Sequence, residues 1–155
     1  MHGSIVTGSP PRVTPRCLAS AEMSEDRRRS LGKLGESLAA RHLEAHGYEV
    51  LERNFRTREG ELDLVLSGAG CLVFCEVKTR LAGRAERATG GPAGPLDAIG
   101  SRKRKRLRML AARWLTTRAA GAERPSEPDL RFDAIGITLD GQGRVLALEH
   151  VEDAF

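Results

Sequence analysis

Aromatic residues are scarce in this chain of 155 residues: they make up 4% of it, whereas all hydrophobic residues make up 40%. The core must therefore be built mainly from Leu, Val, Ile and Ala, and few rings remain for stacking on nucleobases. No apolar run approaches the roughly 20 residues that a membrane-spanning helix needs. We therefore expect a soluble protein with no membrane partner. The length of the chain suits one compact domain.

Cysteine is also rare. Cys17, Cys71 and Cys75 are an odd number and form no C-x-x-C pair. This pattern argues against a zinc site built from close ligand pairs and against a secreted disulfide framework. Reduced cysteines in a cytoplasmic protein are the simplest interpretation.

Charges of both signs are present, and their excess is small: the net charge is +4 and the sequence pI is near 9.3. A modest basic excess favours a polyanionic partner, although the clustering of charge matters more than its sum. Six basic residues occupy seven positions of a predicted helix: Arg102, Lys103, Arg104, Lys105, Arg106 and Arg108. We expect this stretch to contact nucleic acid phosphates. The alternative is an ordinary solvated helix face.

The pattern of apolar residues divides the chain into two parts. Residues 1–24 lack hydrophobic periodicity and contain Ser-Pro-Pro and Thr-Pro, so we predict a disordered N-terminal extension followed by one domain over residues 25–155. The domain is predicted to contain a helix over 25–46, strands over 48–53, 61–66 and 71–79, a helix from 96 or 101 to 118, and strands over 130–139 and 144–151. This order, α-β-β-β-α-β-β, indicates an α/β fold with a mixed β-sheet flanked by helices.

The predicted hairpin of strands 61–66 and 71–79 carries the residues with chemical potential. Side chains alternate between faces along a strand, so one face is apolar while the other presents Asp63, Glu76 and Lys78. The expected register makes Asp63 and Glu76 diagonal neighbours, roughly 7–8 Å apart at the backbone. Two carboxylates at this separation repel unless a cation lies between them, and Mg²⁺ (or Mn²⁺) suits such oxygen ligands. With Lys78 positioning a water, the set is suited to phosphodiester hydrolysis.

The alternative is a solvated strand end with weak ion pairs. Glu76 argues against it, because this acid interrupts an apolar strand of the kind that tends to be central, where an unpaired carboxylate is costly. Glu36 on the first helix lies within roughly 20° of Leu43 around the helix. It can reach the metal site or be an ordinary boundary glutamate, and both interpretations stay open. Asp133 shares a strand face with Ile135, so we expect it to be partly buried, paired with an arginine and structural.

Three further arginines lie close to the acidic strands in the sequence. Arg56 and Arg58 precede the first acidic strand, and Arg80 follows Lys78. These side chains can flank a scissile phosphate, and each is explained equally well as a surface arginine. The histidines show no ligand spacing and are not expected to be catalytic.

Several motifs occur in order: Leu-Gly-Lys-Leu-Gly-Glu at 31–36, Gly-Glu-Leu-Asp-Leu-Val at 60–65, Val-Phe-Cys-Glu-Val-Lys-Thr-Arg at 73–80, Lys103 and Arg-Phe-Asp at 131–133. Asp63 followed by Glu76-Val77-Lys78 resembles the D…(D/E)-x-K signature of restriction-endonuclease-like nucleases. The wider pattern resembles the YraN-like family of small bacterial proteins. This resemblance implies a fold similar to Holliday junction resolvases and tRNA-splicing endonucleases. It also implies a metal site at Glu36, Asp63 and Glu76, with the Val77 carbonyl as a further ligand and Lys78 acting on the water.

Together these features predict a metal-dependent endonuclease of the bacterial cytoplasm that hydrolyses DNA. Branched or structured DNA in repair or recombination is the expected substrate, and DNA is favoured over RNA by analogy of fold alone. Many proteins with this fold act as dimers, so a homodimer is a further expectation. The alternative function is a nucleic-acid-binding adaptor that keeps the nuclease fold with little or no catalysis.

Overall fold

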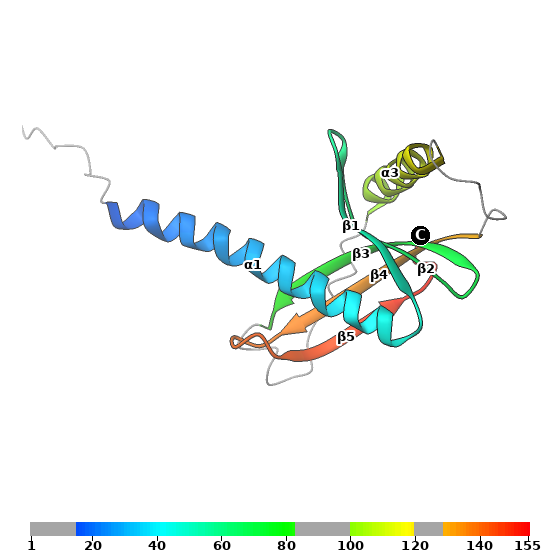
Figure 1. Ribbon diagram of the computed structural model, residues 1–155. Coiled ribbons are helices and arrows are strands. Elements are labelled where there is room, and N and C mark those ends of the chain that lie inside the picture. Colours follow the sequence, from blue (N-terminus) through cyan, green and yellow to red (C-terminus); the bar gives the residue numbers. More distant parts are fainter. Residues whose placement is uncertain (1–14, 83–99, 120–128) are drawn as a thin grey trace, which may run out of the picture. The chain divides into compact units, whose positions relative to one another are not determined.

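The computed structural model describes residues 15–82, 100–119 and 129–155 of the chain (Figure 1). Its elements are α1 (Pro15–Ala45), β1 (Glu49–Thr57), β2 (Gly60–Gly68), β3 (Cys71–Leu81), α3 (Ser101–Ala119), β4 (Asp129–Leu139) and β5 (Val145–Val151). The predicted order α-β-β-β-α-β-β and the predicted fold class, a mixed sheet with helices, are confirmed. The architecture is consistent with a nuclease-like core.

The chain divides into two units, residues 1–30 and 31–155, which are described separately. In the first unit, α1 begins at Pro15, about ten residues earlier than the predicted start at Glu25. Proline is well tolerated in the first turn of a helix, and the Ala, Leu, Met and Glu residues that follow favour helix, so residues 15–24 are helical. Residues 1–14 lie outside the described residues, and the predicted division into an extension and one domain stays a prediction. None of the described helices is both long and apolar enough to cross a membrane.

In the second unit, the described strands form one five-stranded sheet in the order β1-β2-β3-β4-β5. Neighbouring strands are antiparallel except β3 and β4, which are parallel and are connected through α3. Parallel neighbours need a crossover connection, and a helix is the usual one. The strand that carries Glu76, β3, therefore lies in the middle of the sheet, as its nearly continuous apolar sequence predicted.

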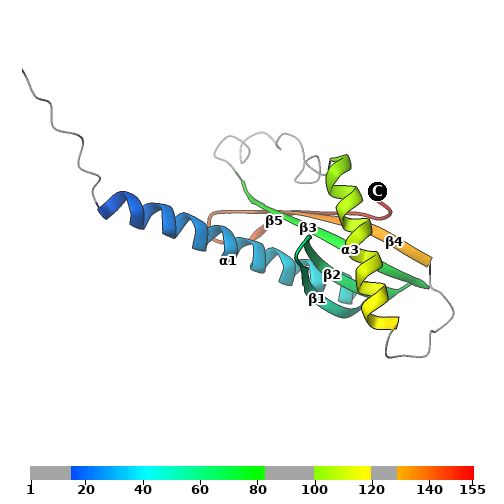
Figure 2. The same ribbon diagram turned by 90° about the horizontal axis from the view of Figure 1, so that it is seen from above.

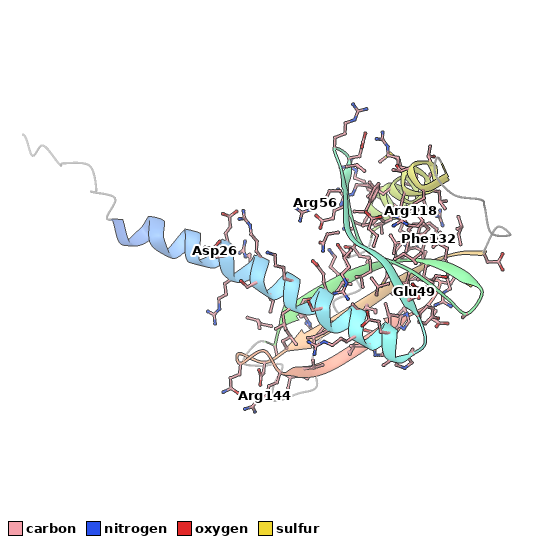
Figure 3. All side chains as sticks on the ribbon, in the orientation of Figure 1. Asp26, Glu49, Arg56, Arg118, Phe132 and Arg144 are labelled. Atoms are coloured by element: carbon pink, nitrogen blue, oxygen red, sulfur yellow. The ribbon has the colours of Figure 1, made fainter. Side chains whose placement is uncertain are left out.

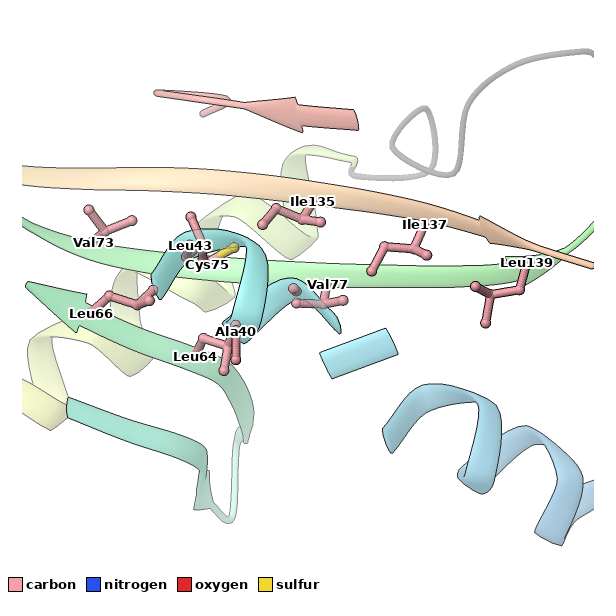
Figure 4. Close-up of a cluster of buried hydrophobic side chains, with 11 residues drawn as sticks. Ala40, Leu43, Leu64, Leu66, Val73, Cys75, Val77, Ile135, Ile137 and Leu139 are labelled. Carbon is pink, nitrogen blue, oxygen red and sulfur yellow. The ribbon is translucent and has the colours of Figure 1, made fainter. Parts of the chain in front are cut away.

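Each face of the sheet packs against a helix of the same unit (Figure 2). The α1 side contains Ala39, Ala40, Leu43, Leu64, Leu66, Val73, Cys75, Val77, Ile135, Ile137 and Leu139 (Figure 4). The α3 side contains Leu62, Val65, Leu72, Phe74, Leu107, Leu110, Ala111 and Trp114. Burial raises the pKa of the Cys75 thiol well above its usual range, so this cysteine is an inert core residue.

The β2–β3 hairpin has a tighter turn than the sequence predicted. Ala69 and Gly70 adopt positive φ angles of 51° and 76°, so a two-residue turn joins the paired residues Gly68 and Cys71. Such turns match the twist of the strands and allow pairing to continue up to the turn. The predicted register, with Leu66 and Cys71 flanking the turn, is therefore wrong. The observed register ends at Leu64 and Cys75, and its continuation by one residue makes Asp63 level with Glu76 rather than diagonal to it.

The alternation of faces along β2 also departs from the prediction. Strict alternation places Leu62 and Leu64 together on the apolar face predicted for the hairpin, but Leu62 packs with the α3 side and Leu64 with the α1 side. Regular pairing of β2 with β3 ends at Leu64 and Cys75, whereas β2 remains paired with β1 as far as Gly60. The two strands thus separate at Asp63, and the β1–β2 hairpin continues beside α3 (Figure 1).

Candidate functional site

Asp63 lies at the point where β2 separates from β3. Its Oδ2 accepts a hydrogen bond of 2.7 Å from the backbone N–H of Val77 on β3. The carboxylate thus takes the place of a backbone carbonyl of β2, because the regular pairing of the two strands has already ended. Burial and the neighbouring Glu76 carboxylate raise the pKa of Asp63 to about 7, against the opposing effect of the Val77 hydrogen bond, and Glu36 acts in the same direction as Glu76. Near neutral pH, the site therefore holds more negative charge than it can readily stabilise.

Glu76 is a buried carboxylate with an incomplete set of partners. Its side chain is 2% exposed. Its Oε1 accepts the ammonium groups of Lys78 at 2.9 Å and Lys103 at 2.7 Å, while its buried Oε2 has no hydrogen-bond partner within the part of the chain that the structure describes. A buried acceptor left without a partner is costly and uncommon. The structure thus brings Asp63, Glu76 and Lys78 together and leaves one carboxylate oxygen available.

Glu36 approaches the same region from α1. The helix passes very close to β3 at Gly35, where an added Cβ would collide with the side chain of Thr79. This close approach places Glu36 near Asn54, whose Nδ2 donates a hydrogen bond of 3.0 Å to Glu36 Oε2. Glu36 is partly buried, and both interpretations, a metal-site acid and a boundary glutamate, stay open.

Asn54 is a site residue that the sequence reasoning missed. It adopts a φ of 54°, a left-handed conformation that Asn tolerates better than most residues with a side chain. Its neighbours Arg53 and Phe55 pair with Leu64 and Leu62, so Asn54 is level with Asp63 across β1 and β2. The available signal was an asparagine inside a strand, where this residue is uncommon.

The donor set of this region fits a hard divalent cation. The available groups are carboxylate oxygens, one of them buried and unpartnered, and two of the acids repel each other. Glu36, Asp63 and Glu76 are nevertheless not drawn together: among the described residues, the group whose ligand atoms all lie within 4.8 Å is elsewhere. Val77 belongs to the region through its N–H, and the ligand role of its carbonyl oxygen stays a prediction.

The more tightly grouped set is Asp133, His150 and Glu152, and it is already occupied by a cationic side chain. Arg131 donates to both oxygens of the fully buried Asp133, at 2.9 and 2.8 Å, and lies 3.3 Å from Glu152. His150 Nε2 lies 2.8 Å from Asp133, and the N–H of Asp153 donates to the same carboxylate. The predicted pairing of Asp133 with an arginine is confirmed. The expectation that His150 has no ligand spacing is wrong, because β5 brings it to a carboxylate distant in sequence.

The basic residues of α3 divide into two groups. Arg102, Arg104, Lys105, Arg106 and Arg108 are exposed. Lys103 instead turns toward Glu76, although it was expected among the phosphate contacts. At helical spacing, Lys103 shares a face with Leu107, Leu110 and Trp114, which pack on the sheet. This helical spacing was the signal in the sequence that Lys103 faces the sheet, unlike the exposed cations of α3.

The three other predicted arginines have partners within the protein. Arg56, which is labelled in Figure 3, lies on the β1–β2 hairpin with Arg58. The two arginines form ion pairs with Glu61 at 3.1 Å and with Glu59 at 2.7 Å. Arg80 is partly buried, and its Nε donates to a threonine hydroxyl on β4 at 3.2 Å. The hairpin arginines remain exposed to solvent, whereas Arg80 also supports the sheet.

Comparison with known proteins assigns the family. Residues 35–137 match the model of the uncharacterised protein family UPF0102. The chain belongs to this family. A UPF0102 protein of Parafrankia sp. is 47% identical over 126 residues, which cover 81% of this chain and 95% of the relative. A UPF0102 protein of Frankia casuarinae is 46% identical over 127 residues, covering 81% and 96% of the two chains.

A more distant UPF0102 protein, from Pelotomaculum thermopropionicum, is 42% identical over 131 residues, covering 84% of this chain and 98% of the relative. The match confirms the resemblance to the YraN-like family. The matched region of the UPF0102 model contains Glu36, Asp63, Glu76, Lys78 and Lys103. The family description names no reaction or ligand.

Proposed function

We propose that this UPF0102 protein is a divalent-metal-dependent endonuclease that hydrolyses phosphodiester bonds in DNA. The observation that carries the proposal is the pair of buried acids. Glu76 has an unpartnered oxygen among the described residues, and the neighbouring Asp63 has a pKa raised to about 7 by burial and by Glu76. An acid with a strongly perturbed pKa in such surroundings is typical of functional sites.

Glu36, Asp63 and Glu76 would hold the ion, with the Val77 carbonyl as a further ligand. Mg²⁺ or Mn²⁺ matches these oxygen donors. When bound, such an ion stabilises negative charge on a phosphate and lowers the pKa of a water molecule. Asp63 would then remain ionised at neutral pH, because its repulsion by Glu76 is compensated.

Lys78 acts as a cation in this proposal. Burial lowers its pKa, but the hydrogen bond to Glu76 and the charges of Glu76 and Asp63 outweigh that effect and raise the pKa overall. The side chain is therefore an ammonium group at neutral pH and cannot serve as a general base. The Lys78 side chain is 38% exposed, so its ammonium group can orient a water or a phosphate oxygen on the solvent side and keep its ion pair with Glu76.

The surface around the site supports binding of a nucleic acid backbone. The exposed cations of α3 offer phosphate contacts, with Arg56 and Arg58 on the neighbouring hairpin as further candidates. Phe74 and Trp114 are packed against each other in the core, with ring centroids 5.8 Å apart, and so are not available for base stacking. Recognition would then depend on backbone and shape, which suits branched or otherwise structured DNA. A cytoplasmic location and a homodimer are parts of the same proposal.

A nucleic-acid-binding adaptor is the second candidate function. The observation in its favour is that Lys78 and Lys103 already neutralise Glu76 without a metal ion. A protein that retains the acids only for stability would need no more than this. The two candidates differ in whether phosphodiester bonds are cleaved.

The test is cleavage of labelled single-stranded, duplex, flap and four-way-junction DNA and of RNA, each with Mg²⁺, Mn²⁺ or EDTA. Asp63→Asn and Glu76→Gln preserve side-chain size and should abolish cleavage. Glu149→Gln, at an exposed position of β5, is the matched control and should retain it. Cleavage that needs the metal and both acids identifies the nuclease and its substrate. DNA binding without any cleavage would support the adaptor.

A further inference from the structure

Lys103 is the basic residue of α3 whose position is hardest to explain as a phosphate contact. Its side chain is 24% exposed and its Nζ lies 2.7 Å from Glu76 Oε1, closer than the Nζ of Lys78 at 2.9 Å. Its charge also lowers the pKa of Asp63, against the raising effects of burial and Glu76. A single ammonium group therefore acts on both buried acids, as a shared metal ion would.

The balance of charge in this cluster changes when a divalent ion is added. The region contains three carboxylates (Glu36, Asp63 and Glu76) and two ammonium groups (Lys78 and Lys103), so it carries one excess negative charge when all are ionised. A divalent ion changes this to one excess positive charge. The ion and the two ammonium groups then repel one another, and such repulsion is strong in a poorly hydrated site. Departure of one lysine restores neutrality.

Lys103 is better suited to leave than Lys78. Lys78 is held on β3 only two residues from Glu76, so its side chain cannot move far from this carboxylate. Lys103 lies in the first turn of α3 between Arg102 and Arg104, which repel its charge and present an exposed basic surface. A phosphate on this surface would offer Lys103 another anionic partner.

We propose that Lys103 is a tethered counter-ion, which holds Glu76 in the metal-free protein and is released when a divalent cation binds. Phosphate contact at the start of α3 would compete for Lys103 and so strengthen cation binding at Glu76. Cation and polyanion binding are then coupled, and the coupling is reciprocal. This inference rests on the metal site of the proposed function, but it concerns binding and can be measured without cleavage.

The first experiment measures Ca²⁺ binding to the full chain by titration calorimetry. Lys103→Met removes the ammonium group and keeps a side chain of similar length, so we expect Ca²⁺ to bind about tenfold more tightly. Arg118→Met removes the same charge from an exposed position at the other end of α3 and should change the Ca²⁺ affinity less than twofold. A short DNA duplex should tighten Ca²⁺ binding to the parent but not to Lys103→Met. Unchanged or weaker Ca²⁺ binding in Lys103→Met would overturn the proposal.

A second measurement uses the unsubstituted protein, so it remains decisive if Lys103→Met does not fold. Acetylation rates of individual lysines are followed by mass spectrometry with and without Ca²⁺. Release from Glu76 should increase the rate at Lys103 severalfold, while the exposed Lys105 on the same helix keeps its rate. A rate at Lys103 that Ca²⁺ leaves unchanged or lowers would overturn the proposal.

The two proposals fail in distinguishable ways. Tighter Ca²⁺ binding in Lys103→Met, together with no cleavage of any nucleic acid, would support the counter-ion and refute the nuclease. Metal-dependent cleavage by the parent, with the same Ca²⁺ affinity in parent and variant, would do the reverse. Absence of Ca²⁺ binding to both proteins would overturn the counter-ion role.

Discussion

Two buried carboxylates on neighbouring strands are held in opposite ways. Asp133 on β4 is fully buried, and its two oxygens are bonded by Arg131, His150 and the backbone N–H of Asp153. Glu76 on β3 is 2% exposed, yet its Oε2 has no partner among the described residues and its Oε1 is shared by two lysines. The first carboxylate is saturated by its own chain, whereas the second retains capacity for a ligand.

The number of hydrogen-bond partners distinguishes a structural carboxylate from a ligand-binding one more clearly than burial does. A buried charge with a complete set of internal partners stabilises one arrangement, and a ligand would have to displace those partners. A buried charge with an open acceptor costs stability until something binds it. Substitutions at the two carboxylates should therefore have opposite consequences for stability and for binding.

The largest effect on stability is expected from Arg131→Met. Asp133 would remain buried without its guanidinium partner, which should lower the free energy of unfolding by about 3–5 kcal/mol. Urea unfolding measures this loss. Arg53→Met is the control, because Arg53 and Glu44 form an exposed ion pair at 3.4 Å, and such pairs contribute no more than about 1 kcal/mol. Equal losses in the two variants would show that Asp133 does not depend on its partner.

Glu76→Gln should have the opposite profile. We expect Ca²⁺ affinity to fall by about 100-fold or more, since losses of 10–100-fold already follow from substitutions outside the ligand shell. The free energy of unfolding should change by less than about 1 kcal/mol, because the amide removes a buried charge that has one unpartnered oxygen, and both lysines can become hydrated. Asp133→Asn is the complementary variant: it should destabilise the protein and leave Ca²⁺ affinity unchanged. If both variants were alike in Ca²⁺ affinity and stability, the distinction between the two carboxylates would be lost.

Gly35→Ala tests how α1 supports the acidic site. The added methyl group collides with Thr79, so we expect a loss of about 1–3 kcal/mol in stability together with weaker Ca²⁺ binding, because Glu36 is displaced. Gly32→Ala is the matched control on the same helix, where none of the described atoms lies within 4 Å of the added carbon. Replacing this helical glycine should stabilise the protein by up to about 1 kcal/mol. Thermal unfolding of both variants checks the contrast.

A more gradual effect is a dependence of stability on pH that comes from Asp63. Burial and Glu76 raise its pKa from 3.8 to about 7 in the folded protein, so between these values the folded state binds more protons than the unfolded state. The free energy of unfolding of the metal-free protein should therefore fall as pH rises from about 4 to about 7. The slope is at most roughly 1.4 kcal/mol per pH unit.

Urea unfolding between pH 5 and pH 8 checks this slope in the parent and in Asp63→Asn, which should lack the contribution. Saturating Ca²⁺ should also flatten the profile of the parent, because the cation keeps Asp63 ionised. A parent and variant with parallel profiles would contradict the raised pKa of Asp63.

Much of the acidic site could be predicted because it follows local rules. The alternation of side chains along β3 placed Val73, Cys75 and Val77 on one face and Glu76 on the other, and the apolar character of the strand indicated its central position. The pairing of Asp133 with an arginine followed in the same way from its strand face. These inferences needed only the period of a strand and the cost of burying a charge.

The errors arose where distant segments meet. The register of β2 and β3 depended on the turn conformation of Ala69 and Gly70, and the face of Leu62 depended on the separation of the strands at Asp63. In the sequence, Lys103 was grouped with the other cations of α3, because its contact with Glu76 depends on the packing of α3 on the sheet.

By itself, the sequence determined the order of the elements, the central strand β3 and the identity of the acid it carries, because hydrophobic periodicity and the cost of unpaired charge are local properties of the chain. Only the tertiary structure decided which charges meet. Lys103 on α3 reaches Glu76, Asn54 on β1 bonds Glu36 on α1, and the charges of Glu36 and Lys103 act on Asp63. Their distances depend on the close approach at Gly35 and on the packing of α3, which no local pattern specifies.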